Sequence, residues 1–119
     1  MQEKKKIFLV DDQRIANMIT KKMIETSGIE CDILAFEEPK NALEALQECP
    51  PEYIFLDLNM PLINGWQFLE NIKERFTSKV IILTSSVDPA DIEKAKNFSQ
   101  VISYQTKPPK REAIKELIL

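Results

Sequence analysis

Short apolar runs alternate with amphipathic segments along the whole chain, and this alternation limits the possible folds more than any other feature. We interpret the apolar runs as buried strands at residues 7–10, 33–36, 53–58, 80–83 and 101–104. Strands that are apolar throughout are typical of parallel sheets that are covered by helices on both faces. The chain is therefore expected to be an α/β protein.

A segment with apolar residues at helical spacing follows each strand. Gly28 and the Pro50–Pro51 pair are natural helix stops, and Pro39 and Pro89 suit first helical turns. The residues that set the spacing are Ile15, Met18, Ile19 and Met23; Ala42, Leu43, Ala45 and Leu46; Trp66, Leu69 and Ile72; Ala90, Ile92 and Ala95; and Ile114, Leu117 and Ile118. Right-handed crossovers then restrict the topology to a doubly wound parallel sheet.

Polar residues follow four of the five predicted strands, where ligands gather in doubly wound folds. They are Asp11 and Asp12 after the first, Asp57 at the end of the third, Thr84 and Ser85 at the end of the fourth, and Lys107 after the fifth. The spacings from Asp12 to Asp57, from Asp57 to Thr84 and from Thr84 to Lys107 fit two, one and one strand-plus-helix units. We therefore expect three carboxylates, one or two hydroxyls and a lysine to converge.

Three carboxylates at close range need a cationic partner. At about 4 Å and an effective dielectric near 20, each like-charged pair costs on the order of 4 kcal/mol. Lys107 supplies one positive charge, and Mg²⁺ prefers a few carboxylates together with water and a phosphate oxygen. Such a pocket suits phosphoryl chemistry, in which a carboxylate acts as the nucleophile and forms an acyl phosphate.

Composition excludes several other functions. The chain has no histidine, which removes a Ser-His-Asp triad, a histidine zinc site and a phosphohistidine on this chain. A net charge of −3 disfavours binding to nucleic acid, and no apolar run is long enough to cross a membrane. Cys31 and Cys49 match no metal or redox spacing and are expected to be structural thiols in the reducing cytosol.

A set of motifs in fixed order carries a resemblance to a known family. They are Asp11-Asp12, Asp57 with Met60-Pro61 and Asn64-Gly65, Thr84 with the small Ser85, Tyr104, and Lys107-Pro108. The chain resembles the receiver domain of two-component response regulators over essentially its full length. The resemblance implies a flavodoxin-like fold, with five parallel strands in the order 2-1-3-4-5 and five helices, as a single receiver domain over residues 1–119 without an output domain.

The resemblance also implies roles for the acidic pocket. Asp57 is the expected phosphoacceptor. Asp12 is the expected main metal-binding carboxylate, Asp11 acts through a metal-bound water, and the Asn59 backbone carbonyl is a further ligand to Mg²⁺ or Mn²⁺. Lys107 is expected to pair with the phosphoryl group, and the Lys107–Pro108 bond is expected to be cis.

The switch residues are implied in the same way. Thr84 is expected to turn toward the phosphoryl group, Tyr104 to swing inward in response, and Ser85 to leave room for its ring. Asn59 and Ser86, each two residues beyond a site residue, are expected to tune the lifetime of the phosphoryl group. Taken alone, Tyr104 would be a half-buried strand aromatic.

Two positions depart from the family pattern. Gln13 stands where many receivers have a third acid, which leaves the main ligands intact but weakens the local negative field. Asn64 replaces an aspartate, and both residues suit the turn. Trp66 is expected to pack in the core, and the lysines at 4–6 to be a solvated terminus.

The predicted function is a cytoplasmic, phosphorylation-dependent signalling switch rather than an enzyme with turnover. A partner histidine kinase or histidine phosphotransfer protein would donate the phosphoryl group. The surface formed by residues 89–119, the fourth helix, fifth strand and fifth helix, would signal to a downstream protein. The domain is expected to be a monomer or a weak dimer formed on activation.

Other functions compete with this prediction. A phosphorelay intermediate would pass the phosphoryl group to a histidine phosphotransfer protein, and an interaction domain could act without phosphorylation. A phosphatase of the haloacid dehalogenase type would need an acid two residues after the nucleophile, where this chain has Asn59. A flavin carrier would need a glycine-rich phosphate loop, and the chain has only two glycines.

Overall fold

Five parallel strands form one sheet in the order β2-β1-β3-β4-β5 in the computed structural model, which describes residues 4–118. The strands are β1 (Lys5–Val10), β2 (Cys31–Phe36), β3 (Tyr53–Leu56), β4 (Lys79–Thr84) and β5 (Val101–Thr106). This is the predicted order. The ends of the predicted domain, residues 1–3 and 119, lie outside the described residues.

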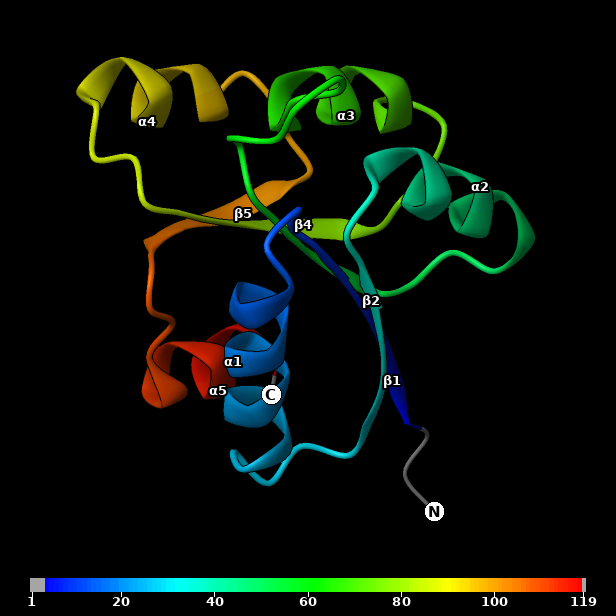
Figure 1. Ribbon diagram of the computed structural model, residues 1–119, viewed down its shortest axis with the longest axis vertical. Helices are drawn as coiled ribbons and strands as arrows, with labels where there is room; N and C mark the ends of the chain where they lie inside the picture. The colour runs from blue at the N-terminus through cyan, green and yellow to red at the C-terminus, as the bar shows by residue number, and fades with distance from the viewer. Residues whose placement is uncertain (1–3, 119) are drawn as a thin grey trace.

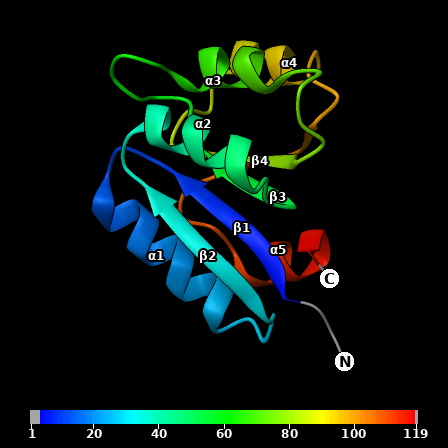
Figure 2. The same ribbon diagram turned by 90° about the vertical axis from the view of Figure 1, so that its right-hand side faces the viewer.

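Helices cover both faces of the sheet, as Figures 1 and 2 show. They are α1 (Arg14–Glu25), α2 (Pro39–Glu48), α3 (Gly65–Ile72), α4 (Pro89–Ala95) and α5 (Arg111–Ile118). Helices α1 and α5 lie side by side on one face, and α2, α3 and α4 cover the other. Among the described residues, no helix combines the length and the apolar character that a membrane span requires.

The sheet separates two apolar cores because successive residues of a strand point to opposite faces. In β1, Ile7 and Leu9 pack with Ile24, Ile114 and other residues on the α1–α5 side. Phe8 and Val10 belong to the second core, with residues of α2, α3 and α4. The sheet is buried on both faces, which explains why its central strands are apolar throughout.

The apolar stripe that predicts α1 is not its buried face. Ile15, Met18 and Ile19 are 71%, 61% and 47% exposed. Asn17 and Thr20 are buried in their place. The helix exists where its periodicity predicts, but its buried face combines the apolar Ile24 with the polar Asn17 and Thr20.

Trp66 packs against the core only in part. Its ring stacks on Phe98 at a centroid distance of 6.0 Å, and the Lys94 ammonium lies 4.8 Å from the Trp66 ring. These contacts tie α3 to α4 on one side of the sheet.

Candidate functional site

The loops after β1 and β3 bring three carboxylates together. Asp11 and Asp12 follow β1 directly, and Asp57 is the first residue after β3. One oxygen from each carboxylate lies within 4.8 Å of the other two. Asp11 and Asp57 are 6% and 5% exposed, and Asp12 is half-buried. The predicted convergence of the three acids is present.

Lys107, directly after β5, neutralises part of this negative charge. Its Nζ atom lies 2.5 Å from Oδ2 of Asp11 and 3.1 Å from Oδ2 of Asp57. Burial lowers the pKa of Lys107, but the hydrogen bonds to Asp11 and Asp57 outweigh this effect, so the net pKa is raised. The lysine is therefore held in its charged form between two buried acids.

The pKa of Asp11 is raised above its ordinary value. Burial raises its pKa, and the hydrogen bonds from Lys107 and the Gln13 amide offset only part of that effect. The Gln13 N–H donates to Oδ1 of Asp11 over 2.9 Å. A further cation near Asp11 would favour its ionised form.

Asp57 sits in a tightly packed turn. Its Oδ1 atom accepts a hydrogen bond from the Asn59 amide at 3.2 Å, while Oδ2 faces Lys107. Gly65, at the start of α3, lies against this turn, and a Cβ atom there would be 2.6 Å from the Asp57 carbonyl oxygen. Only glycine permits this approach of two backbone segments.

Asn64 sets the start of α3. Its side chain accepts from the Gln67 amide, and the Gln67 side chain accepts from the Asn64 amide, both at 2.9 Å. This is a reciprocal capping box. The replacement of aspartate at this position therefore preserves a cap as well as the turn.

Thr84 is fully buried at the end of β4. Its Oγ1 atom accepts weak hydrogen bonds from the Asn59 side chain at 3.5 Å and from the Ser86 amide at 3.4 Å. Its neighbour Ser85 is exposed. The Thr84 hydroxyl oxygen is therefore engaged by the loops that follow β3 and β4.

Tyr104 of β5 reaches the same loop. Its hydroxyl donates to the Ser86 backbone carbonyl over 3.1 Å, and its ring is half-buried against the core. Ser86 itself donates its hydroxyl to Asp91 of α4 over 2.7 Å. Ser86 therefore contacts two elements of the expected signalling face.

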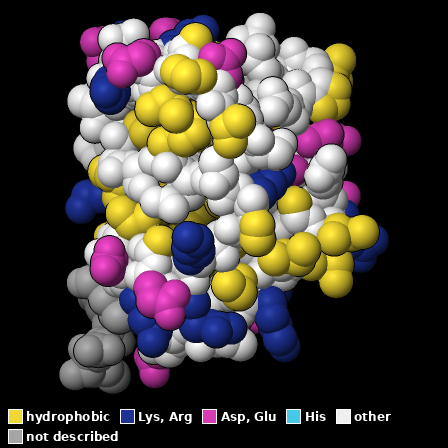
Figure 3. Space-filling model, turned by 90° about the vertical axis from the view of Figure 1, so that its left-hand side faces the viewer, with side chains coloured by type: hydrophobic (Ala, Val, Ile, Leu, Met, Phe, Trp, Pro, Cys, Tyr) yellow, Lys and Arg dark blue, Asp and Glu magenta, His cyan; other side chains and the backbone are white. Residues whose placement is uncertain are grey.

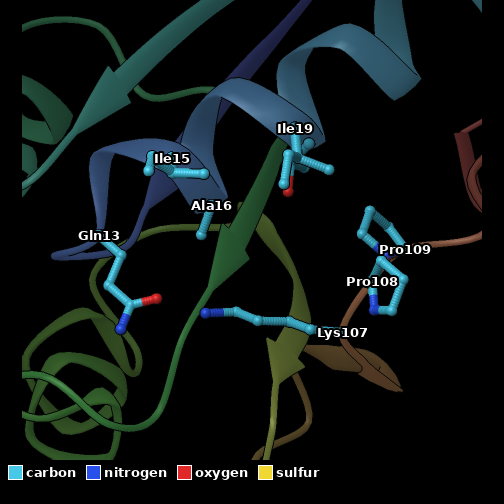
Figure 4. Close-up of a pocket in the computed structure, with 8 residues that line it drawn as sticks. Gln13, Ile15, Ala16, Ile19, Lys107, Pro108 and Pro109 are labelled. Carbon is cyan, nitrogen blue, oxygen red and sulfur yellow. The ribbon is translucent and has the colours of Figure 1, made fainter.

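The β5–α5 loop closes the site on the side of α1. The Lys107–Pro108 peptide bond is cis, as expected. The two prolines 108 and 109 and Lys107 line a groove of about 390 Å³ together with Gln13, Ile15, Ala16, Ile19 and Thr20. In Figure 4 the Lys107 side chain extends beneath Ala16 toward the Gln13 side of this groove.

Asn17 supports the acidic pocket and was missed from the sequence. Its side-chain amide donates to the backbone carbonyls of Asp11 and Phe36, at 3.0 and 3.2 Å. These bonds join α1 to the ends of β1 and β2. The sequence does contain one signal for it. Asn17 lies three residues before Thr20 and seven before Ile24, a spacing that places all three on one face of a helix.

The three acids fit a hard divalent cation. All the donors are carboxylate oxygens, which Mg²⁺ and Mn²⁺ prefer, and they lie close enough to share one ion. The raised pKa of Asp11 indicates that Lys107 alone does not offset its burial.

Comparison with known proteins agrees with this geometry. Residues 7–119 match the response regulator receiver domain family. The chain is 34% identical over 80 residues to the transcriptional regulatory protein YdfI of Bacillus subtilis, covering 67% of this chain and 38% of that protein. It is 28% identical over 114 residues to protein PilG of Pseudomonas aeruginosa, covering 92% of this chain and 81% of PilG.

Solved structures share the fold. A two-component response regulator from Cytophaga hutchinsonii superposes with a TM-score of 0.88 at 31% identity, covering 97% of this chain and 95% of that one. The chain spans only 38% of YdfI and 22% of the transcriptional regulator NtrC of Proteus hauseri. The match over residues 7–119, the strand order and the pocket together show that this chain belongs to the response regulator receiver domain family of two-component signalling.

Proposed function

We propose that Asp57 accepts a phosphoryl group from a phosphohistidine of a partner histidine kinase or histidine phosphotransfer protein. An Asp57 carboxylate oxygen forms a bond to phosphorus as the phosphorus–nitrogen bond of the donor breaks. The donor imidazole keeps that electron pair, and the product is an aspartyl phosphate. The observation that carries this proposal is the buried Asp57, with one oxygen on the Asn59 amide and the other beside Lys107.

The residues around Asp57 would bind the metal ion and stabilise the transferred phosphoryl group. Asp11, Asp12, Asp57 and the Asn59 carbonyl would hold Mg²⁺ or Mn²⁺, which when bound supplies positive charge for the phosphoryl oxygens. Lys107 brings a second positive charge to the Asp57 side of the pocket. Thr84 would donate its hydroxyl to the added group. Positioning and electrostatics then account for most of the rate.

The direct test is intact mass spectrometry after incubation with acetyl phosphate and Mg²⁺. We expect a gain of about 80 Da, one phosphoryl group, that needs the metal and is lost in Asp57→Asn. A gain that persists in Asp57→Asn would place the modification elsewhere. No gain in the wild type would leave a phosphorylation-independent interaction domain as the better explanation.

The exposed apolar residues of α1 favour docking of the donor beside the pocket. A donor histidine must reach Asp57, so its protein has to cover the surrounding rim. Ile15 and Ile19 are exposed on this rim and line the groove that Lys107 enters. Apolar surface of this kind contributes most of the free energy of association when it is buried.

A docking role for α1 can be tested by comparing a protein donor with a small-molecule donor. Only the protein donor has to bind the exposed residues of α1. For a histidine kinase that phosphorylates the wild type, we expect Ile15→Ser to slow transfer about tenfold, because about 1.4 kcal/mol of binding is lost. Uptake from acetyl phosphate should be unchanged. Leu34→Ser is the control, since Leu34 is 45% exposed on β2 away from this groove. Equal slowing with both donors would refute a docking role.

The α4–β5–α5 surface is the proposed output. Ile92 and Ile102 are 38% and 40% exposed there, and a groove of about 210 Å³ lies between α4 and β5. Figure 3 views this side and shows one group of apolar side chains at the level of α4 and another at the level of α1. Tyr104 joins this surface to the β4–α4 loop.

Phosphorylation at Asp57 should change this surface by drawing Thr84 toward the added group. We expect the backbone amide resonances of α4 and β5 to shift with acetyl phosphate in the wild type. In Tyr104→Ala, uptake should be normal and the shifts in β5 should shrink. Normal shifts in that variant would exclude Tyr104 from the coupling.

The cellular compartment and the oligomeric state of the protein are also proposals. Free Cys31 and Cys49 suit the reducing cytoplasm. The net charge of −3 argues against a nucleic-acid surface on these residues. The domain would act as a monomer, or as a weak dimer once it is phosphorylated, and would turn over only its own phosphoryl group. Transfer of that group onward to a histidine phosphotransfer protein would instead make it a relay intermediate.

A further inference from the structure

Three of the hydrogen bonds made by Ser86 lead to three different parts of the molecule. Its amide donates to Oγ1 of Thr84, its carbonyl accepts from the Tyr104 hydroxyl, and its own hydroxyl donates to Oδ2 of Asp91. The bond to Asp91 is the shortest of the three, at 2.7 Å, against 3.4 and 3.1 Å. Ser86 therefore links the pocket, the tyrosine and helix α4.

The bond to Asp91 has features of a strong interaction. Its acceptor is a carboxylate, and hydrogen bonds to charged groups are shorter and about twice as strong as neutral ones. Both side chains are half-buried, so water competes less with the bond than it would at an open surface. The Asp88 amide also donates to the Ser86 hydroxyl oxygen, at 3.4 Å.

Asp91 is well placed to hold that hydroxyl in one orientation. It lies in the first turn of α4, where a negative charge is favoured. The start of this turn is fixed independently, because the Asp88 side chain accepts from the Ala90 amide at 2.9 Å. Asp91 is therefore not needed as the helix cap, and its carboxylate is available to position Ser86.

From these contacts we propose that Asp91 is a positioning residue of the switch. Its carboxylate holds Ser86 so that the Ser86 carbonyl can accept the hydrogen bond from the Tyr104 hydroxyl. Helix α4 and Tyr104 therefore move together. This rests on the proposed function only in naming Tyr104 as part of a switch. The contacts themselves belong to the unphosphorylated protein, so the coupling can be tested without phosphorylation.

The experiment uses the two tyrosines of the chain, Tyr53 and Tyr104. Both are replaced by 3-fluorotyrosine, and the fluorine resonances are assigned with Tyr53→Phe and Tyr104→Phe. We call the Tyr104 ring seated when its hydroxyl is bonded to the Ser86 carbonyl, and released when it is not. In the wild type we expect the fluorine resonance of the seated Tyr104 ring to dominate. In Asp91→Ala the ratio of seated to released ring should fall about tenfold, the effect of losing one charge-assisted hydrogen bond.

Three variants show whether the effect passes through the bond. Ser86→Ala should change the Tyr104 line as Asp91→Ala does, and the double variant should change it no further. Asp91→Asn keeps an acceptor oxygen and should retain most of the seated population. Glu93→Ala is the matched control, because it removes an equal charge from an exposed residue of α4 that pairs with Lys96.

The competing explanation is that this hydrogen bond only closes the loop. The melting temperature would then fall in Asp91→Ala and Ser86→Ala while the Tyr104 line stayed as in the wild type, and that pair of results would overturn the proposal. Additive effects of Asp91→Ala and Ser86→Ala would also overturn it. Acetyl phosphate uptake is measured in parallel. Its absence in the wild type would count against the proposed function and leave this coupling to be judged by the fluorine spectra.

Discussion

The backbone of Gly65 lies so close to the Asp57 turn that a Cβ atom on Gly65 would be 2.6 Å from the Asp57 carbonyl oxygen and 2.7 Å from the Leu58 Cα atom. Neither contact can be relieved by a side-chain rotation, because both partners are backbone atoms. Gly65 therefore has a role beyond the start of α3. Because it has no Cβ atom, α3 can pack directly against the turn that holds Asp57, the proposed phosphoacceptor.

We predict that Gly65→Ala impairs both stability and chemistry. Overpacking of this kind costs about 1 to 3 kcal/mol of unfolding free energy. A shift of Asp57 by about 1 Å slows phosphoryl uptake by roughly tenfold to hundredfold. Urea unfolding and uptake from acetyl phosphate measure the two effects.

Gly28→Ala is the matched control for this prediction. Gly28 has a φ of 87° and open space around its Cβ position. Alanine there should cost about 1 to 2 kcal/mol through backbone strain alone and leave the uptake rate unchanged. Equal loss of uptake in both variants would show that general destabilisation, and not the contact with Asp57, is responsible.

We predict that Asn17→Ala destabilises the protein by about 1 to 3 kcal/mol. The change leaves the Asp11 and Phe36 carbonyls without their side-chain donor in a buried region. Asn71→Ala is a control on an exposed helix position, where the side chain bonds Gln67 of its own helix, and should stay within about 0.5 kcal/mol. Urea unfolding checks both, and indistinguishable losses would contradict the supporting role of Asn17.

Mg²⁺ should stabilise the fold through the three acids. At a concentration tenfold above its dissociation constant, an ion that binds only the folded state adds about 1.4 kcal/mol. We expect the melting temperature to rise with Mg²⁺ and the rise to shrink in Asp12→Asn. Asp32→Asn removes an exposed acid of β2 as a control and should respond as the wild type does. An undiminished response in Asp12→Asn would exclude Asp12 as a main ligand.

Tyr104 should ionise at higher pH than an ordinary tyrosine. Burial raises its pKa, and the charges of Asp91, Asp88 and Asp57 add to this effect, which outweighs the lowering by the hydrogen bond with Ser86. The stability that its neutral hydroxyl contributes is fully present below about pH 10 and is lost as pH rises through the raised pKa. The absorbance difference between wild type and Tyr104→Phe should have its midpoint above about pH 10. A midpoint at or below that value would contradict this environment.

Much of the fold was predictable because each strand is a separate apolar run. A parallel sheet buried on both faces leaves a local signal in every strand, and prolines and glycines separate the helices. The strand ends then place Asp11, Asp57 and Lys107 at one edge without any knowledge of distances. The observed strand order agrees with that expectation.

The direction in which α1 faces was not predictable from its apolar spacing. Apolar residues usually define the buried face, yet Ile15 and Ile19 are exposed and Asn17 is buried. The reason is that the ends of β1 and β2 present carbonyls to α1, and the Asn17 amide satisfies them. No sequence pattern within the helix records where those carbonyls lie.

The sequence by itself therefore determined the alternation of strands and helices and the identity of the acids, the lysine and the hydroxyl at the strand ends. Only the tertiary structure decided which oxygen faces which neighbour. It places Lys107 between Asp11 and Asp57, Gly65 against the Asp57 turn, and Ser86 between Tyr104 and Asp91. Periodicity and strand ends are local properties of a chain. Contacts between residues far apart in sequence depend on the packing of whole elements, and packing is settled by the sum of many weak interactions across the fold.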